Sequence, residues 1–387
     1  MSEHNVAVFT GSRAEYGLLR YLIMNIAGDP FFRLQLIVSG SHLSKNYGQT
    51  LNEILSDGIP IAARVSLSLD KIPLPPMYAL TAEALEGVGA VLEQLKPKLL
   101  IVLGDRYEAF ASAAAAHLLS IPVVHLHGGE TTESVVDDRL RHAITQFSSW
   151  HFTVAEPYRR RVVAMGHSPS CVFKVAPLAM DGILQTPVLT HSEFESITGY
   201  RFSELNLLVT YHPVTLLADR GLLGFANLLQ ALSLIRCNIL FTYPNADAGS
   251  DELLKLMNEF INLNTDRAYV VPSLGHHRYL SALLLFEAMA GNSSSGVIEA
   301  PLVGLPTLNI GSRQSGRLMP ETVVNVSAQT NEILSGLETV LLQGRNSNRS
   351  RARSQHCSSP SMLIVKFLKS ILDQGSTDRV ILKPSSI

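Results

Sequence analysis

The sequence has little of what marks secreted, membrane-spanning or metal-binding proteins. It has three cysteines in 387 residues, Cys171, Cys237 and Cys357. They are scattered and lack metal-ligand spacing, so we interpret these thiols as bystanders. No apolar run approaches the roughly 20 residues that span a bilayer. The first residues, MSEHNVAVFTG, have no basic segment followed by an apolar core. We therefore expect a cytoplasmic protein without membrane contact.

An excess of charge of either sign is also missing. Lysine and arginine total 31 against 33 aspartates and glutamates, which gives a net charge of −2. This balance provides no general attraction to nucleic acid or to an anionic membrane. The basic segment 344–360, GRNSNRSRARSQHCSSP, lacks interleaved aromatic residues. We expect an exposed loop there and no nucleic-acid partner.

What the chain does contain is a repeated alternation of short apolar segments with longer helical patterns. The apolar segments show almost no polar alternation, which is typical of parallel strands covered on both faces. We expect strands at residues 5–10, 34–39, 99–103, 122–126, 151–154, 172–175, 205–210, 238–242, 268–271, 307–310 and 323–326. We expect helices at residues 80–95, 107–119, 139–147, 222–234 and 252–262. The pattern predicts an α/β fold with two Rossmann-like doubly wound domains.

The length fits two domains, and the boundary is expected where periodicity is weakest. That stretch is DGILQTPVLTHS, residues 181–192. We assign residues 1–185 to an N-terminal domain and residues 186–360 to a C-terminal domain. An amphipathic helical pattern within residues 361–387 needs a core to cover it.

Polar motifs follow the predicted strands of the first half, and ligands of such folds bind at the carboxyl ends of strands. Arg13 lies in TGSRAEYG, which is not a GxGxxG motif, so no dinucleotide is expected. Asp105 lies in GDRYE and is either a helix N-cap or a catalytic carboxylate. His127 and Glu130 lie in HLHGGE. Asp137 opens the next helical pattern and could also be a cap.

The His-x-His pair at the end of the fourth strand raises the question of a metal. His125 and His127 would share a face, because alternate residues of a strand do. No third ligand follows at a fixed spacing. We therefore expect no metal and no cofactor.

The second half contains a loop suited to a phosphate, GNSSSGVIEAP at residues 291–301. Its backbone N–H groups and an apolar helix predicted at 297–303 favour an anion. Glu299 could accept hydrogen bonds from ribose hydroxyls, and Arg313 and Arg317 could balance a diphosphate without metal. His212 ends a strand. The alternative is a serine-rich turn with two surface arginines.

Taken together, these motifs resemble a known family. GSRAEYG, LGDRYE, HGGE with DDRLRHAIT, YHPVT, YPNADAGS, and GNSSSGVIEAP with GSRQSGR occur in one order and spacing. They resemble the hydrolysing UDP-N-acetylglucosamine 2-epimerases of bacterial sialic-acid biosynthesis and their relatives in legionaminic-acid synthesis, over about residues 5–330. The resemblance implies two Rossmann-like domains facing across a cleft, the GT-B arrangement, with the active site between them. It also implies that the helix within 361–387 crosses back to the first domain, and that the protein is a homodimer or homotetramer.

The resemblance further implies a two-stage reaction. A proton leaves carbon 2 of the sugar as UDP leaves carbon 1, which gives 2-acetamidoglucal. Water then adds and a proton returns on the opposite face, releasing N-acetylmannosamine. The residues that match catalytic acids and bases are Asp105, His127 and Asp137, with Glu130 as a further candidate. The positions that match substrate or UDP contacts are Arg13, Arg106, His212, Asn245, Asp247, Ser293, Ser294, Glu299, Arg313 and Arg317.

One position departs from the commoner family pattern. Many relatives have a glutamate where this chain has His127, and a histidine with an ordinary pKa of about 6.5 can still exchange protons at neutral pH. UDP-N-acetylglucosamine is the favoured substrate, and UDP-2,4-diacetamido-2,4,6-trideoxyglucose is the alternative within the same reaction. A GT-B glycosyltransferase or a UDP-sugar-binding regulator would leave the acid–base residues without a use.

Overall fold

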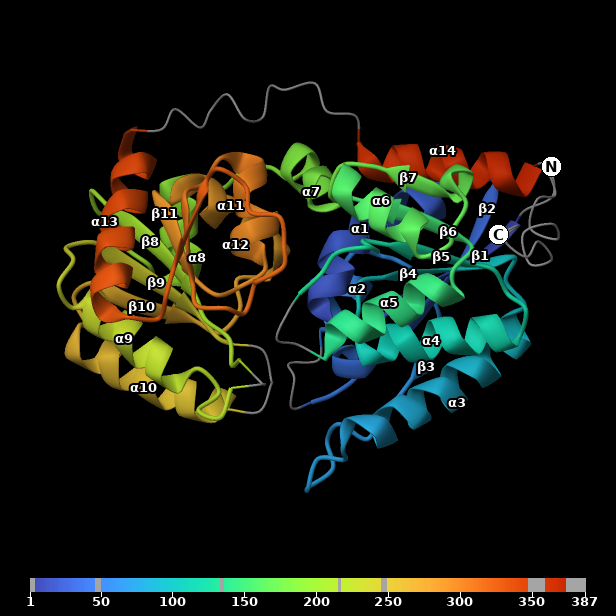
Figure 1. The fold of residues 1–387 in the computed structure, drawn as a ribbon, viewed down its shortest axis with the longest axis horizontal. Helices are drawn as coiled ribbons and strands as arrows, with labels where there is room; N and C mark the ends of the chain where they lie inside the picture. Colours follow the sequence, from blue (N-terminus) through green and yellow to red (C-terminus); the bar gives the residue numbers. More distant parts are fainter. Residues whose placement is uncertain are drawn as a thin grey trace. The chain divides into compact units, whose positions relative to one another are not determined.

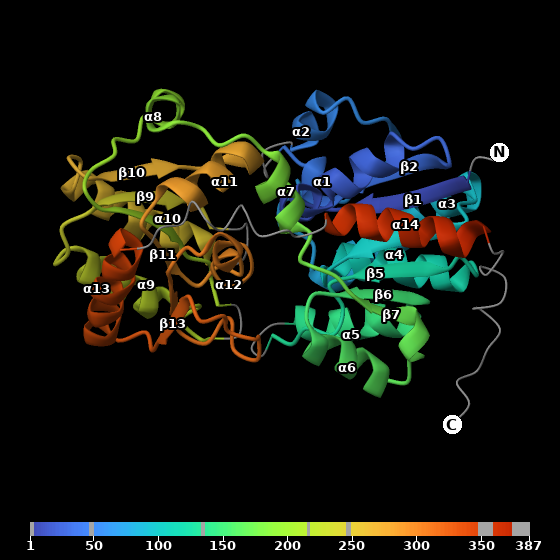
Figure 2. The same ribbon diagram turned by 90° about the horizontal axis from the view of Figure 1, so that it is seen from above.

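The structure is a computed structural model that describes residues 4–45, 50–132, 136–214, 217–244, 249–346 and 359–373. The chain forms two compact units (Figure 1, Figure 2). Unit 1 comprises residues 1–130, 136–181 and 357–387, and unit 2 comprises residues 131–135 and 182–356. No helix among the described residues is long and apolar enough to span a bilayer.

Unit 1 is built on a seven-stranded parallel sheet with the order β3-β2-β1-β4-β5-β6-β7. Its strands are β1 (His4–Thr10), β2 (Phe32–Ser39), β3 (Ile61–Val65), β4 (Leu99–Leu103), β5 (Val123–Leu126), β6 (Trp150–Thr153) and β7 (Val172–Lys174). Its helices are α1 (Arg13–Ala27), α2 (Leu51–Ser56), α3 (Met77–Leu95), α4 (Tyr107–Leu118), α5 (Asp137–Phe147), α6 (Glu156–Ala164) and α14 (Pro360–Asp373), with 3₁₀ turns η1 (Gly40–His42) and η2 (Pro169–Cys171). Helix α7 (Ala179–Gln185) contains the boundary with unit 2.

Unit 2 is built on a six-stranded parallel sheet with the order β10-β9-β8-β11-β12-β13. Its strands are β8 (Asn206–Thr210), β9 (Asn238–Thr242), β10 (Ala268–Val271), β11 (Ala288–Gly291), β12 (Thr307–Ile310) and β13 (Val323–Val326). Its helices are α8 (His191–Thr198), α9 (Leu222–Leu232), α10 (Ser250–Leu263), α11 (Gly275–Leu285), α12 (Ser295–Ile298) and α13 (Thr330–Asn346), with a 3₁₀ turn η3 (Ala300–Val303).

The predicted fold class, two doubly wound parallel α/β units, is confirmed. In each sheet the strand order reverses beside the first strand of the unit, between β1 and β4 in unit 1 and between β8 and β11 in unit 2. In unit 1 the helices that follow these two strands, α1 and α4, pack on opposite faces of the sheet. Such switch points are where open α/β sheets bind ligands.

The structure adds two strands that the sequence did not predict. Strand β3, IAARV, lies at the sheet edge, and its exposed residues alternate with half-buried ones before the buried Val65, so it lacks the continuous apolar signal. Strand β11, AMAG, is central and buried, but alanine and glycine carry no strand preference.

The apolar helix expected at residues 297–303 is wrong. Helix α12 has a single turn, Ser295–Ile298, and is followed by the 3₁₀ turn η3. Pro301 cannot donate a backbone hydrogen bond, and it disfavours the α conformation of the residue before it. The helix dipole invoked for phosphate binding is therefore short, and the loop must act mainly through its own N–H groups and side chains.

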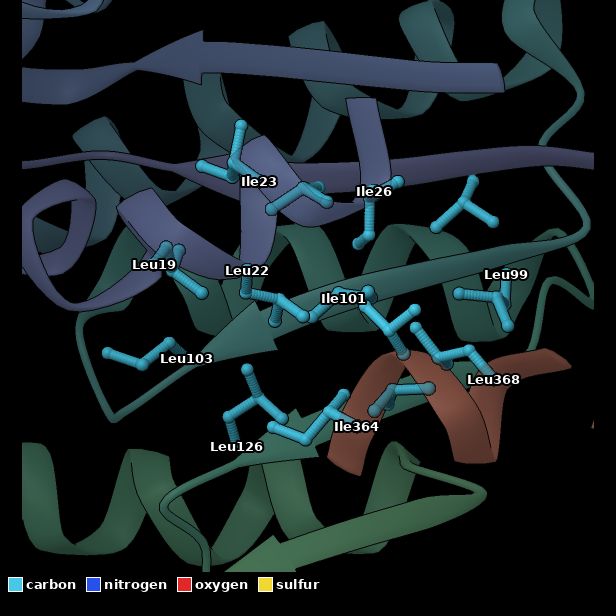
Figure 3. Packing of buried hydrophobic residues seen from close by; sticks show 14 of the residues in the cluster. Leu19, Leu22, Ile23, Ile26, Leu99, Ile101, Leu103, Leu126, Ile364 and Leu368 are labelled. Carbon is cyan, nitrogen blue, oxygen red and sulfur yellow. The ribbon is translucent and has the colours of Figure 1, made fainter. Parts of the chain in front are cut away.

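The core of unit 1 explains why its strands are apolar on both faces. Val6 and Val8 of β1 face the layer formed by α1 and α14, whereas Ala7 and Phe9 face α3, α4 and α5. Figure 3 shows side chains from α1, β4, β5 and α14 meeting in the first of these layers.

Helix α14 lies beside α1 within unit 1 (Figure 1). Asp181 holds its start, because the Asp181 carboxylate accepts the backbone N–H of Ser361 at 3.0 Å. Near the other end, the Lys369 ammonium lies 2.6 Å from the carboxylate of Asp29, which follows the C-cap of α1. The chain passes from unit 1 to unit 2 after Asp181, four residues before the boundary expected at 185.

Removing core volume from α14 should destabilise unit 1. Leu368 is 0% exposed and Leu363 of the same helix is 45% exposed. Leu368→Ala should lower the free energy of unfolding by about 2–5 kcal/mol through lost burial and a residual cavity. Leu363→Ala, the matched control, should change it by less than about 0.5 kcal/mol. Urea unfolding measures both, and equal small effects would show that α14 does not pack on this core.

Candidate active site

The carboxyl ends of β1 and β4 lie side by side and hold the first group of candidate residues. Arg13 is the first residue of α1, and its side chain is exposed. Gly11 and the loop after β2 approach closely, since a Cβ on Gly40 would lie 2.4 Å from the Gly11 carbonyl oxygen. Residue 40 must be glycine for two reasons: a Cβ would clash with Gly11, and the backbone φ of +57° lies in the left-handed region that favours glycine.

Arg106 is tied to a carboxylate that the sequence interpretation missed. Glu108, at 0% exposure, accepts two hydrogen bonds from the Arg106 guanidinium, at 3.1 Å each. This fork uses Nε and one terminal nitrogen, and it balances the arginine's charge. Arg106 can still donate to a sugar hydroxyl through its remaining N–H groups, but its attraction for a diphosphate is reduced.

Glu15 is a second buried acid at this edge of the sheet. The Gly11 N–H donates to Glu15 Oε2 at 2.6 Å, and Glu15 Oε1 has no hydrogen-bond partner among the described residues. Burial, and then the negative charge of Glu108, raise the pKa of Glu15 to about 8. The group therefore carries a proton at neutral pH, so the Arg106–Glu108–Glu15 cluster has no net charge.

Asp105 lies next to a buried guanidinium. Arg141 of α5 is 1% exposed and donates to the Asp105 carboxylate. It also donates to Asp138 at 3.1 Å and to the main-chain oxygen of Glu130 at 2.9 Å. One side chain thus joins the ends of β4 and β5 to the start of α5.

The helix-cap alternatives for the aspartates are wrong. Arg106 occupies the N-cap of α4, so Asp105 precedes the cap. Val136 occupies the N-cap of α5. Asp137 and Asp138 lie in the first turn of this helix, where the helix dipole stabilises carboxylates. Asp105 and Asp137 therefore remain candidates for proton transfer.

His127 and Glu130 follow β5 and are both buried, at 7% and 4% exposure. The His127 Nδ1 lies 3.6 Å from Glu130 Oε1, which is within range of an ion pair when the ring is protonated. Gly129 permits this turn, because a Cβ there would lie 2.5 Å from the main-chain oxygen of Tyr158. Strand β5 ends at Leu126, and His127 has a φ of +64°. The strand alternation from which we expected His125 and His127 to share a face therefore does not reach His127.

His125 has a structural environment. Its Nε2 lies 2.8 Å from the main-chain oxygen of Gly104, so this nitrogen must carry the proton, and Nδ1 lies 3.2 Å from the Thr145 hydroxyl. Burial lowers the pKa of His125 to about 4, which keeps the ring neutral. No group of three or more metal-ligating side chains converges within the part of the chain that the structure describes. His125 therefore supports the turn that carries Asp105.

The second group of candidate residues lies in unit 2, at the ends of β8, β11 and β12. Asn292 links the first two ends: its side chain accepts from the His212 N–H at 2.7 Å and donates to the His212 carbonyl at 2.8 Å. Its own carbonyl accepts from Arg313 at 3.2 Å and from Gln314 at 2.9 Å. Gly291 allows this approach, since a Cβ there would lie 1.9 Å from the Thr210 oxygen. Asn292 and Gln314 were missed, although both lie within the quoted motifs.

His212 and the serine loop lie together. His212 Nε2 is 3.4 Å from Ser293 Oγ, and the Ser293 hydroxyl is also 3.4 Å from the Ser295 N–H. Burial, with a smaller effect of Arg313, lowers the pKa of His212 well below its usual value. Ser294 is the N-cap of α12. A neutral His212 is thus a hydrogen-bonding group here rather than a cation.

The remaining predicted residues divide between described and undescribed positions. The Glu299 carboxyl, at the end of α12, is half-buried, and burial raises its pKa. Arg317 follows β12, and its backbone N–H donates a hydrogen bond to the Gln314 carbonyl at 3.3 Å. Asn245 and Asp247 lie outside the described residues.

Comparison with known proteins identifies the family to which the chain belongs. The sequence model of the UDP-N-acetylglucosamine 2-epimerase family matches residues 24–360. The chain belongs to this family. It is 34% identical over 329 residues to the GDP/UDP-N,N'-diacetylbacillosamine 2-epimerase (hydrolyzing) of Campylobacter jejuni, covering 84% of this chain and 85% of the relative. It is 30% identical over 340 residues to the UDP-N-acetylglucosamine 2-epimerase of Neisseria meningitidis, covering 88% of each.

The fold of this epimerase agrees with solved structures. The crystal structure of UDP-GlcNAc 2-epimerase from Neisseria meningitidis, bound to UDP-GlcNAc, superimposes with a TM-score of 0.76 at 17% identity, covering 95% of this chain and 100% of that one. At this identity the likeness concerns the fold. The predicted family and the predicted enzyme class, a hydrolysing UDP-sugar 2-epimerase, are confirmed by the curated relatives.

The raised pKa of the buried acid Glu15 predicts that the stability of this epimerase depends on pH. In the unfolded chain a glutamate loses its proton near pH 4.3, whereas folded Glu15 keeps it to a pKa of about 8. The folded state therefore binds more protons between these values, and its stability falls by up to about 1.4 kcal/mol per pH unit as pH rises. Glu15→Gln removes this titration, so the variant should gain stability relative to wild type from pH 5 to pH 8.

Urea unfolding at several pH values measures this difference. Glu86→Gln, an exposed position of α3 in the same unit, is the control, and its difference from wild type should not change with pH. A constant difference for Glu15→Gln as well would mean that Glu15 is ionised in the folded protein.

Proposed function

We propose that this epimerase converts UDP-N-acetylglucosamine and water into free N-acetylmannosamine and UDP. The observation that carries the proposal is the buried Arg141, which gathers the Asp105 carboxylate and the main chain of Glu130 at the end of a parallel sheet, in the turn that also bears His127. Proton removal beside a leaving group needs such fixed acids and bases. We assign the sugar ring to this group of residues in unit 1.

In the first step a base removes the proton from carbon 2, a C1=C2 double bond forms, and the C1–O bond breaks. UDP leaves with the bonding electron pair. Asp105 and Asp137 are the candidate bases, and the fixed guanidinium of Arg141 holds Asp105 in one orientation. The departing diphosphate carries the developing charge, and Arg313, Arg317 and the serine-loop N–H groups of unit 2 are assigned to it.

In the second step water adds to carbon 1, and a proton is delivered to carbon 2 from the opposite face. The delivering group must differ from the base of the first step, because one carboxylate cannot reach both faces. His127 fits this role, since Glu130 lies 3.6 Å from its Nδ1 and would stabilise the imidazolium before transfer.

The alternative substrate is UDP-2,4-diacetamido-2,4,6-trideoxyglucose, through the same reaction. It is favoured by the 34% identity to the Campylobacter jejuni diacetylbacillosamine enzyme, against 30% to the Neisseria meningitidis enzyme. The two sugars differ at carbons 4 and 6, and no residue described above is assigned to those carbons. With N-acetylglucosamine the product would serve sialic-acid synthesis. We further infer a homodimer or homotetramer from the family resemblance.

Product analysis tests the function. Purified protein is incubated with each UDP-sugar, and products are identified by NMR. We expect UDP and a free sugar with inverted configuration at carbon 2, with the faster substrate identifying the pathway. Transfer of the sugar to an acceptor, or binding without turnover, would contradict the proposal and favour a glycosyltransferase or a regulator.

His127 should be needed for turnover and not for nucleotide binding. His127→Ala should lower kcat by about 10²–10⁴ while the Kd for UDP stays within about twofold. His127→Glu should retain part of the activity, with its pH profile displaced toward acid, since glutamate titrates about two units lower. His117→Ala, an exposed histidine of α4, is the control and should behave as wild type. Loss of UDP binding in His127→Ala, together with a lower Tm, would instead make His127 structural.

A further inference from the structure

Helix α6 carries an arginine that contacts the turn after β5, residues 127–130, which we call the glycine turn. Arg160 points outward: its side chain is 78% exposed and lies 3.4 Å from Glu156. The next residue, Arg161, is half-buried, and its Nη1 donates a hydrogen bond to the main-chain oxygen of Gly129 at 2.5 Å. Arg161 therefore reaches the candidate active site from outside every motif that pointed to the function.

The glycine turn depends on hydrogen-bond donors from side chains. Gly129 is buried, and among the described residues no backbone N–H donates to its carbonyl oxygen. A buried carbonyl without a donor is unfavourable, so the Arg161 bond meets a need that the sheet leaves open. The following carbonyl, that of Glu130, accepts from Arg141 at 2.9 Å. Two guanidinium groups from two helices thus hold consecutive carbonyls of the turn, and such charge-assisted bonds are strong.

The backbone of the glycine turn needs these anchors. His127 and Gly129 both have a left-handed φ, at +64° and +79°. A residue other than glycine keeps this conformation only where its surroundings hold it. The His127 N–H donates to the Phe152 carbonyl of β6 at 2.8 Å, and Arg161 holds the chain two residues later. The direction in which His127 presents its ring is therefore set between these two contacts.

Packing leaves the Arg161 side chain little freedom. Its guanidinium lies over the Tyr158 ring, 5.9 Å from the ring centroid, and Tyr158 is 6% exposed. A Cβ on Gly129 would lie 2.8 Å from Val162 Cγ2, so the helix and the turn are in direct contact. The cation–π contact and the hydrogen bond together keep the guanidinium at the turn.

We propose that Arg161 positions His127 for the return of the proton to carbon 2, by holding the Gly129 carbonyl and with it the glycine turn. This inference rests on the proposed function, because it assumes that His127 delivers that proton. Arg161 is a positioning residue, and the His127 imidazole is the group that transfers the proton. Displacing a reacting group by about 1 Å can cost about 10²-fold in rate. Loss of Arg161 should therefore slow the second stage of the reaction more than the first.

The ratio of products distinguishes the two stages. The first stage gives UDP and 2-acetamidoglucal, and the second adds water to this intermediate to give the free sugar. Arg161→Met keeps an unbranched side chain against Tyr158 and removes the donor. By NMR, wild type should release UDP and free sugar in equal amounts. Arg161→Met should form free sugar about 10–10²-fold more slowly and release 2-acetamidoglucal. Arg161→Lys, which keeps a charged donor, should release less of the intermediate than Arg161→Met.

Arg160→Met is the matched control, because it removes the exposed neighbouring arginine of the same helix. It should keep the wild-type rate and product ratio. The Kd for UDP should stay within about twofold in every variant. His127→Ala should also release 2-acetamidoglucal, and Arg161→Met added to it should have no further effect, because both changes act on the same step.

The outcomes separate the role of Arg161 from the function itself. An equal loss of UDP release and free sugar in Arg161→Met, no loss of either, or a further loss in the double variant would overturn the positioning role. If Arg161→Met does not fold, Arg161→Lys is judged by the same product ratio against wild type. Failure of both to fold would make Arg161 structural and overturn the role as well. Wild-type protein that forms no free sugar would instead remove the proposed function.

Discussion

The guanidinium of Arg141 is the interaction on which the carboxyl end of the unit 1 sheet depends. At 1% exposure it is nearly removed from water, and its charge faces the carboxylates of Asp105, Asp138 and Glu130. Taking away one partner of a buried pair leaves an uncompensated charge, at a cost of about 3–5 kcal/mol. The same cation fixes the Glu130 carbonyl, so the orientation of Asp105 and the path of the turn after β5 are set together. Under the proposed function, one side chain thus contributes both to the stability of unit 1 and to the orientation of a proton-transfer group.

In unit 2, neutral groups hold the strand ends together. There Asn292 exchanges two hydrogen bonds with the His212 backbone and ties the ends of β8 and β11. Its carbonyl then orients Arg313. Under the proposed function, unit 2 binds the diphosphate, and unit 1 holds the carboxylates that transfer protons. The charge of Arg106 is already balanced by Glu108, so within the proposed function we assign Arg106 to the sugar rather than to the diphosphate.

Much of the fold could be predicted because parallel strands covered on both faces are apolar at every position. The strands at residues 99–103 and 238–242 were predicted with the bounds that the structure shows. Strand β3 was not predicted because an edge strand tolerates polar residues such as Arg64. Strand β11 was not predicted because Ala and Gly give no strand signal.

The candidate residues at strand ends could be named from local motifs, but their partners could not. Arg141, Glu15 and Asn292 all lie inside the quoted motifs, yet their importance comes from partners that are far away in the sequence. Glu15 shows the physical reason most clearly. Its raised pKa depends on burial and on Glu108, which is 93 residues away, and no local pattern records either.

The central claim is that a proton is taken from carbon 2 of a UDP-sugar and returned on the other face. The reaction run in D₂O tests it most directly, with the released sugar analysed by NMR. Because the returning proton comes from an acid in exchange with solvent, the account predicts one deuterium at carbon 2 of a sugar with inverted configuration. A released sugar that keeps its original hydrogen and configuration at carbon 2 would show simple hydrolysis at carbon 1 and contradict the account.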